Sequence, residues 1–367
     1  MIPSVELDIL KVKRFLKSSL AVLPEPYTTM DSSRLTMLFF ILSGLDIIDA
    51  LGEVDKDQRR TIVDWIYSLQ IGTREVSSPR RGGFRGTKTN SDSTSRVHKL
   101  DSGHLAMGYT GLCCLLILGD DLSRLDKLGV LANMKACQQC DGSVSCMPDA
   151  GENDMRFVYC ACAISYMLQD WRALSVSKLL HFIQESRTYE GGFGQSPGLE
   201  AHGGSTYCAV ASLKMLNDQN CNSEDLISIL PNARDCDVLR RWCVWRQTEG
   251  FNGRPHKQDD SCYSFWICAT LEILNGIDLV DREKAIEFTL STQDDRTGGF
   301  GKYADSLPDL MHTYLSLAGL SVLGYSGLLE LDPCLNVSKR AVAHLQALQE
   351  RWIIENDKTV IPCCAES

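Results

Sequence analysis

No run of apolar residues in this 367-residue sequence is long enough to cross a lipid bilayer. The apolar run 112–118, for example, has seven residues, whereas a membrane-spanning helix needs about 20. The N-terminus also lacks a basic segment followed by an apolar stretch, so no signal peptide is visible. These absences predict a cytoplasmic protein without stable insertion into a membrane.

Excess positive charge is also absent, because the net charge is −10. A nucleic-acid partner would require a basic stripe, so we expect none. The 16 cysteines show no paired metal-binding spacing. The one C-x-x-C motif, Cys137 to Cys140, has no second pair nearby and is interpreted as structural. No stretch alternates as a sustained β-strand would, which favours an all-α fold.

One unit instead recurs along the chain at intervals of roughly 50 to 60 residues, a period typical of helical arrays. Each unit has a helical run ending near a glutamine, then a Gly-rich turn, a polar stretch and a second, apolar helix. The turns span 82–86, 141–143, 191–194, 250–253 and 298–301. The preceding glutamines are Gln70, Gln138, Gln184, Gln247 and Gln293.

The second helix of each unit is apolar nearly all round, which predicts burial on most faces, whereas its partner is amphipathic. Residues 33–51 and 61–70 look like a first, divergent unit. About six hairpins predict a closed alpha-alpha barrel, or toroid, as a single domain over residues 1–367; an open solenoid is the alternative. Residues 72–100 are expected to form a surface loop, and the tail from about 356 to be frayed.

In a closed barrel the starts of the inner helices gather at one rim. Polar side chains recur there, although any one of them alone would be an ordinary helix cap. They are His104, Arg156, His202–Gly204, Asp260–Cys262 and Pro308–His312. Their repetition at equivalent positions predicts a functional site at this rim.

Three rim residues form a candidate zinc site. Cys262 and His312 occupy equivalent places in consecutive units, so their helices should be neighbours, and Asp260 lies just before the helix of Cys262. One thiolate, one imidazole and one carboxylate are suitable zinc ligands and leave a coordination position open, as in catalytic sites. The spacing alone is not specific for zinc.

A second rim cluster is basic and contains His202, Arg254 and Lys257, with Tyr263 beside it. Arginine and lysine near helix N-termini suit a diphosphate. Gly203 and Gly204 would let a ligand approach the backbone closely. Aromatic residues on the inner helices below, such as Tyr159 and Trp266, are usually plain core. Here they predict a lined space for an apolar tail attached to the diphosphate.

These segments resemble the protein prenyltransferase beta subunits, and the resemblance covers about residues 34–339. The motifs that carry it are Glu200–Cys208, Gly253–Lys257, Asp260–Trp266 and Pro308–His312. It implies an alpha-alpha barrel, one zinc ion held by Asp260, Cys262 and His312, and an obligate alpha subunit. It further implies a prenyl diphosphate site. The implied binding residues are His202, Gly204, Arg254, Lys257, Tyr263, Arg156, Tyr159, Cys208, Trp266 and Thr36.

Among the members of this family, the sequence is most similar to the type I geranylgeranyltransferases. The farnesyl enzyme carries a tryptophan in place of Thr36, and the smaller residue makes room for a fourth isoprene unit. Lys302 stands where the farnesyl enzyme has a magnesium-binding aspartate, which implies that magnesium is not required. The implied pocket for the last residue of the protein substrate contains His104, Ala106, Phe157 and Met311. Met311 departs from the usual leucine.

The implied reaction transfers a C20 group from geranylgeranyl diphosphate to a cysteine in a C-terminal CaaX sequence, with X preferably leucine, of proteins such as small GTPases. Asp260, Cys262, His312, Lys302 and Tyr263 are the expected catalytic residues. The alternatives are a farnesyltransferase-type or other prenyltransferase beta subunit, a terpene cyclase or a non-enzymatic helical-repeat scaffold. A cyclase would require an acidic D-x-D-D motif, which the sequence lacks, and a scaffold would not require the three zinc ligands.

Overall fold

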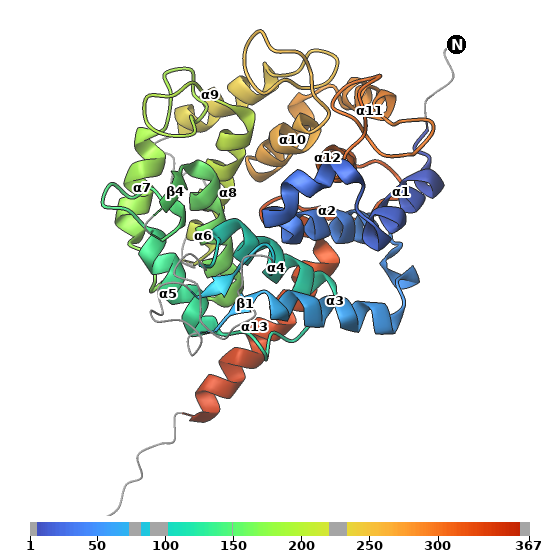
Figure 1. Cartoon of the computed structure of the whole chain (residues 1–367). Helices are drawn as coiled ribbons and strands as arrows, with labels where there is room; N and C mark the ends of the chain where they lie inside the picture. Colours follow the sequence, from blue (N-terminus) through green and yellow to red (C-terminus); the bar gives the residue numbers. More distant parts are fainter. Residues whose placement is uncertain (1–5, 73–81, 89–101, 149, 220–232, 360–367) are drawn as a thin grey trace, which may run out of the picture.

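The computed structural model describes residues 6–72, 82–88, 102–148, 150–219 and 233–359, and helices dominate these ranges (Figure 1). The inner helices are α2 (Arg34–Ile47), α4 (Leu105–Ile117), α6 (Met155–Leu168), α8 (Gly203–Gln219), α10 (Tyr263–Ile273) and α12 (Leu310–Val322). The outer helices are α1 (Ile9–Ala21), α3 (Lys56–Ser68), α5 (Lys127–Cys137), α7 (Val176–Glu185), α9 (Ala233–Val244) and α11 (Arg282–Ser291). A last helix, α13, spans Lys339–Thr359.

The remaining elements are short. Within the described ranges, 3-10 helices cover Glu25–Ser33, Leu51–Glu53 and Ile277–Leu279. The strands are β1 (Gln70–Ile71), β2 (Gly83–Phe84), β3 (Ser145–Met147), β4 (Ala150–Asn153), β5 (Leu331–Asp332) and β6 (Val337–Ser338). They form three separate antiparallel pairs, β1 with β2, β3 with β4 and β5 with β6.

The inner helices form a closed ring. Each of them packs against the next one in the chain, and α12 packs against α2 (Figure 1). Their composition explains this position: α4, for example, buries every residue except Ala106, and a helix without a polar face requires neighbours on all sides. The expected all-α toroid of about six hairpins is therefore confirmed in the described part of the chain.

The hairpins differ from the expected ones at the N-terminus. Residues 33–51 and 61–70 contain α2 and α3, but these two helices belong to different hairpins. Each outer helix precedes its inner partner, so α1, which the sequence did not predict, pairs with α2. No Gly-rich turn links α1 to α2, because the connection is the 3-10 segment Glu25–Ser33. The repeat pattern therefore gives no signal for this hairpin.

Every Gly-rich turn is held by the same short antiparallel bridge to the end of its outer helix. The bridged pairs are Gln70–Phe84, Gln138–Val144, Arg187–Phe193, Gln247–Phe251 and Gln293–Phe300. Gln184, which the sequence assigned to this place, lies within α7 instead. The repeat position in that unit is occupied by Arg187.

The bridging glutamines also tie each hairpin to the next. The carboxamide of Gln138 binds both the N–H and the C=O of Ser175, at 2.7 and 3.1 Å. Gln247 does the same with Asp281, at 2.9 and 2.7 Å. In the unit without a glutamine, Arg187 forms an ion pair with Asp235 at 2.6 Å. These contacts fix the spacing between consecutive outer helices.

The far end of the ring is covered by the chain itself. Tyrosine hydroxyls from four inner helices donate to backbone carbonyls of the loop between β5 and β6. Tyr109 bonds Leu335, Tyr159 and Tyr207 bond Cys334, and Tyr314 bonds Asn336, at 2.7 to 3.2 Å. The loop therefore lies across the barrel as a floor.

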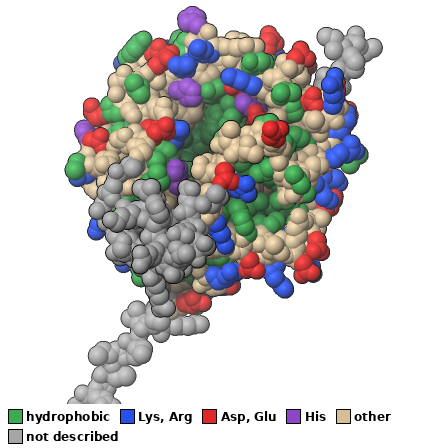
Figure 2. Space-filling model, in the orientation of Figure 1, with side chains coloured by type: hydrophobic (Ala, Val, Ile, Leu, Met, Phe, Trp, Pro, Cys, Tyr) green, Lys and Arg blue, Asp and Glu red, His purple; other side chains and the backbone are tan. Residues whose placement is uncertain are grey.

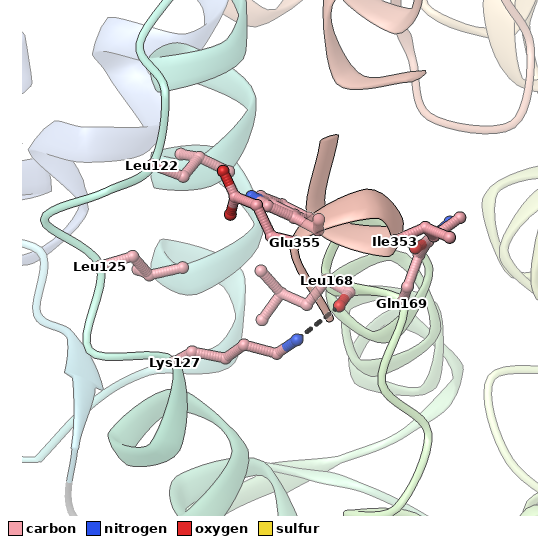
Figure 3. A pocket seen from close by; sticks show the side chains of 8 residues that line it. Leu122, Leu125, Lys127, Leu168, Gln169, Ile353 and Glu355 are labelled. Atoms are coloured by element: carbon pink, nitrogen blue, oxygen red, sulfur yellow. Dashed lines mark hydrogen bonds between the residues drawn. The ribbon is translucent and has the colours of Figure 1, made fainter. Parts of the chain in front are cut away.

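Helix α13 covers the C-terminal ends of α4 and α6. Gln349 donates to the carbonyls of Tyr166 and Met167, and His344 contacts the carbonyl of Asp120 at 2.9 Å. Beside it, Lys127 donates to the Leu168 carbonyl at 2.8 Å in a pocket that Ile353 and Glu355 also line (Figure 3). The Met167 and Leu168 carbonyls lie in the last turn of α6, where backbone acceptors lack a partner within the helix. The end of α13 projects away from the barrel (Figure 1).

Two expectations on loops need adjustment. The surface loop predicted for 72–100 lies mostly outside the described residues, but within it Gly83–Phe84 forms β2 and Phe84 is fully buried. That part is core, because Phe84 belongs to the repeated turn. The tail is helical through Thr359, and 360–367 lie outside the described residues. None of the described helices combines the length and apolar character of a membrane span.

The glutamine contacts predict a stability effect. Replacing Gln247 by alanine removes two hydrogen bonds between neighbouring hairpins, and we expect a loss of about 1 kcal/mol in the free energy of unfolding. Chemical denaturation measures it. The matched control is Gln184→Ala, an exposed position on α7. Equal stability of the two variants would show that these contacts do not hold the hairpins together.

Candidate metal centre and adjoining anion pocket

The predicted rim residues lie at the N-terminal ends of inner helices. His104, Asp154 and Asp309 are the N-caps of α4, α6 and α12, and each accepts a hydrogen bond from a backbone N–H of its own helix. His202 and Asp260 accept equivalent bonds from the N–H groups of Gly204 and Cys262. Because the inner helices run parallel around the ring, these side chains meet on one face.

That face is hollow. Figure 2 shows hydrophobic side chains inside the hollow and histidine and basic side chains around its edge. The arrangement follows from the helices: their interior residues are apolar, and the polar residues occur at their starts. The face thus combines an apolar interior with a charged rim, as the sequence predicted.

The three predicted metal ligands lie together. One ligand atom from each of Asp260, Cys262 and His312 falls within 4.8 Å of the others, and all three residues are buried. Asp260 and Cys262 lie at the start of α10, and His312 lies on α12. The two helices pack against each other, which confirms that these positions in consecutive hairpins are neighbours.

The imidazole of His312 is oriented by two carboxylates. Its Nδ1 contacts Asp309 at 2.5 Å, and its Nε2 faces Asp260 at 3.3 Å. Burial lowers the pKa of His312, but the hydrogen bonds to Asp260 and Asp309 outweigh burial and raise it to about 9. Burial and the neighbouring Asp260 raise the pKa of the Cys262 thiol. The cluster therefore favours a positive charge at its centre.

These residues fit a zinc ion. Tetrahedral zinc with bonds of about 2.0–2.3 Å places its ligand atoms roughly 3.3–3.8 Å apart. The Asp260–His312 separation of 3.3 Å already matches, and the outer limit of 4.8 Å requires only a small contraction. Asp309 holds Nδ1 of the histidine, so Nε2 is the ligand atom, in the arrangement common at zinc sites.

A basic pocket of about 290 Å³ adjoins the metal cluster. It is lined by His202, Gly253, Arg254, Lys257, Gln258, Asp260, Tyr263, Lys302 and Tyr303. Among the predicted diphosphate residues, the structure brings His202, Arg254, Lys257 and Tyr263 together in this pocket. The expected catalytic residue Lys302 lies there too, with its ammonium 3.7 Å from Asp260. A pocket with three cationic side chains against one carboxylate suits an anion.

His202 and Tyr263 form a donor pair in this pocket. Tyr263 Oη lies 2.8 Å from His202 Nε2. Since His202 Nδ1 accepts from the Gly204 N–H at 3.1 Å, a neutral imidazole carries its proton on Nε2. It then donates to the tyrosine oxygen, which leaves the phenol O–H free to point at a ligand. Burial and Arg254 lower the pKa of His202, which favours this neutral form.

The glycines serve packing more than ligand approach. A Cβ on Gly253 would lie 2.2 Å from the ring of Tyr263, and one on Gly203 would lie 3.0 Å from it. Position 253 therefore requires glycine because Tyr263 packs against it, whereas a side chain at 203 would require the Tyr263 ring to shift slightly. Gly204 orients His202 through its N–H, and its contact with a ligand stays a prediction.

The predicted tail-binding residues line the ring at different depths. Thr36 on α2 is half-buried, with its hydroxyl 3.7 Å from the sulfur of Met107. Trp266 is half-buried, and its side-chain neighbour Tyr207 packs 5.1 Å away, centroid to centroid. Cys208 and Tyr159 are buried, and Tyr159 already belongs to the floor. The space above this floor is what remains for a tail.

Three of the residues predicted to contact the peptide lie at the starts of α4 and α6, and the fourth lies elsewhere. The rings of His104 and Phe157 pack edge to face, with centroids 5.8 Å apart, next to the half-buried Ala106. Arg156 lies over the Phe157 ring and is held by Asp154 and Glu152. It is therefore not among the residues that line the basic pocket. Met311, 37% exposed, lies on α12 beside His312.

Sequence reasoning gave no role to three acidic residues of this region. Asp309 orients His312. Asp259 is buried, and its carboxylate accepts from Thr248 and from the N–H groups of Glu249 and Gly250, which fixes the turn before Arg254. Glu200 pairs with Arg254 at 3.0 Å. Only Asp309 had a signal, its place three residues before His312 at a helix start.

Comparison with known proteins agrees with this geometry. Residues 7–337 match the prenyltransferase alpha-alpha toroid domain. The chain is 36% identical to the geranylgeranyl transferase type-1 subunit beta of Dictyostelium discoideum, over 90% of this chain and 95% of that protein. It is also 36% identical to its Arabidopsis thaliana counterpart, over 90% and 89%. The solved Candida albicans protein geranylgeranyltransferase-I complexed with GGPP superposes with a TM-score of 0.81 at 27% identity, covering 94% of this chain and 99% of that chain.

The role of Asp309 is testable. We expect Asp309→Ala to weaken zinc binding about 10- to 100-fold, because Nδ1 of His312 loses the group that orients it. Competition with a chromogenic chelator measures the affinity. Asp309→Asn keeps an oxygen that can accept from the helix N–H, so it separates loss of the cap from loss of charge at the imidazole. Unchanged affinity in both variants would exclude the orienting role.

Proposed function

The chain belongs to the prenyltransferase alpha-alpha toroid family, among the type-1 geranylgeranyl transferase beta subunits, and we propose that it is the catalytic subunit of a zinc-dependent protein geranylgeranyltransferase type I. The observation that carries the proposal is the buried Asp260, Cys262 and His312 cluster adjoining a basic pocket above an apolar hollow. The 36% identical relatives support the same function. They leave the terpene cyclase and scaffold alternatives without support.

The proposed donor is geranylgeranyl diphosphate. The similar Candida albicans enzyme was solved with GGPP, and the pocket here offers Arg254, Lys257 and Lys302 to a diphosphate. The C20 tail would extend into the hollow toward Thr36. A threonine at this position leaves volume that a larger side chain would fill, so the tail can be longer than C15.

Asp260, Cys262 and His312 would hold one zinc ion. When bound, zinc supplies a Lewis acid that lowers the pKa of a substrate thiol, so that the thiolate exists at neutral pH. Asp309 holds the His312 imidazole in the orientation that this requires. Burial of the three residues keeps water away from the ligands.

In the proposed reaction the cysteine sulfur of the protein substrate forms a bond to C1 of the prenyl chain. The C1–O bond breaks, and the diphosphate leaves with the bonding electrons. Arg254, Lys257 and Lys302 stabilise the negative charge that grows on the leaving oxygens, and Tyr263 donates its O–H to them. Lys302 supplies a positive charge at this place, so magnesium would not be required.

The proposed acceptor is a protein with a C-terminal CaaX sequence, such as a small GTPase. His104 and Phe157 would contact the last residue, and an apolar pocket of this kind favours leucine. Met311 is flexible and fills space differently from a leucine. The relatives are beta subunits, and the proposed partner is the corresponding alpha subunit. A cytoplasmic location stays a prediction.

The first test is the activity of this chain co-expressed with a prenyltransferase alpha subunit. We expect one bound zinc and transfer of the C20 group to a peptide ending in leucine, without added magnesium. Cys262→Ala should lose both zinc and turnover, because a thiolate ligand is removed. Metal analysis and product mass spectrometry measure these outcomes. A fully active Cys262→Ala variant would exclude the proposed metal site.

Donor length gives an independent test. Thr36→Trp fills the end of the tail space, so we expect kcat/KM for the C20 donor to fall at least tenfold while the C15 donor is retained or improved. The two donors are compared with one peptide. Thr36→Ser, which keeps the volume small, is the control and should retain the C20 preference. An unchanged donor ratio in Thr36→Trp would show that residue 36 does not limit chain length.

A further inference from the structure

One cation of the basic pocket, Arg254, forms an ion pair with Glu200. Nη1 of Arg254 lies 3.0 Å from Oε2 of Glu200, and both side chains are partly exposed, at 40% and 52%. Glu200 lies in the loop before α8 and Arg254 in the loop before α10, so the pair joins two hairpins. Glu200 itself does not line the pocket. It therefore contacts the pocket through Arg254.

This ion pair is weaker than the contact that would replace it. Exposed ion pairs contribute little because water screens them and two long side chains must be ordered. A diphosphate carries several charges, and a guanidinium binds phosphate oxygens through two parallel hydrogen bonds. A bound diphosphate would thus draw Arg254 away from Glu200, or share it with the carboxylate.

A second cation, Arg246, is close enough to Glu200 for their charges to interact. Arg246 is 7% exposed, and its Nε and Nη1 have no hydrogen-bond partner among the described residues. Its guanidinium packs 5.0 Å from the ring of Trp242. Burial lowers the pKa of Arg246, and the negative charges of Glu190 and Glu200, which raise it, only partly offset this effect. When Arg254 turns to a ligand, the charge of Glu200 therefore still interacts with that of Arg246.

We propose that Glu200 is a positioning residue that holds Arg254 when the pocket is empty and competes with the diphosphate for it. The proposal rests on the proposed function, because it assumes that this pocket takes a prenyl diphosphate. The carboxylate opposes the bound anion and recovers Arg254 when the diphosphate leaves. It thereby lowers the affinity for the donor and speeds release of the product diphosphate.

Removing the carboxylate has a defined sign. The backbone of Arg254 is fixed without Glu200, because Asp259 holds the turn before it and the Gly253 carbonyl accepts from the Gly203 N–H at 2.8 Å. His202, Lys257, Tyr263 and Lys302 remain in the pocket. Loss of the competing charge therefore outweighs loss of the orienting partner, and we expect Glu200→Gln to bind diphosphates about three- to tenfold more tightly.

The chain offers matched controls. Glu200→Asp keeps the charge and should stay near the wild-type affinity. Glu190 lies in the same loop and its charge also acts on Arg246, but its carboxylate accepts from Trp242 at 3.4 Å and forms no ion pair with Arg254. Glu190→Gln removes the same charge from the same loop and should leave diphosphate affinity unchanged.

The experiment uses the heterodimer with the alpha subunit and titrates inorganic pyrophosphate and geranylgeranyl diphosphate by calorimetry. In Glu200→Gln we expect both dissociation constants to fall about three- to tenfold, inhibition by pyrophosphate to strengthen equally, and kcat not to rise. The difference should shrink at high salt. Unfolding curves check that the variants are folded.

The outcomes separate the two proposals. Unchanged or weaker pyrophosphate binding in Glu200→Gln would overturn the role of Glu200, as would an equal gain in Glu190→Gln, because the effect would then be a general one of charge. A wild-type heterodimer that binds neither pyrophosphate nor the donor would instead overturn the proposed function of the pocket.

Discussion

Closure of the ring is the constraint on which the rest of the molecule depends. Helix α12 must meet α2, and the carboxamide of Gln293 binds the N–H and C=O of Asp8 at 3.0 and 3.2 Å, across 285 positions of sequence. Such a contact between distant residues is entropically costly to form, and the burial of six nearly apolar helices offsets it. Once the ring is closed, the angular place of every inner helix is fixed. Cys262 and His312 are neighbours because they lie at the starts of consecutive inner helices that pack against each other.

Closure also determines where chemistry can occur. An inner helix is largely surrounded by protein, so a polar side chain along its length needs a buried partner, as the tyrosines above the floor have. At its start the first N–H groups have no partner within the helix and require an acceptor. His104, His202, Asp260 and Asp309 provide that acceptor and also lie at the rim. Capping and function thus use the same residues, which is why functional side chains recur once per hairpin.

The repeated parts of the fold could be predicted from the sequence, whereas the parts without a repeat could not. Gly-rich turns and apolar helices indicated the toroid and placed the three metal ligands together. Helix α1 has no such turn before α2 and was missed. Arg187 replaces a bridging glutamine, so Gln184 was assigned in its place. The floor depends on hydroxyl–carbonyl contacts such as Tyr109 to Leu335, which leave no spacing pattern. For the same reason the roles of Asp259 and Glu200 are visible only in three dimensions.

The metal cluster and the basic pocket share one carboxylate and are not independent. Asp260 faces His312 at 3.3 Å on one side and the ammonium of Lys302 at 3.7 Å on the other, and it also lines the pocket. Burial raises the pKa of Asp260, but hydrogen bonds from His312 and Cys262 outweigh burial and lower it, so the carboxylate is charged at neutral pH. A cation bound at the cluster would weaken the electrostatic attraction between Asp260 and Lys302. Lys302 would then attract an anion in the pocket more strongly. At the other edge Glu200 restrains Arg254 in the same manner. The chain has a net charge of −10, but the pocket is basic. Its neighbouring acids, Asp260 and Glu200, are paired with Lys302 and Arg254, and these two cations can turn toward a ligand.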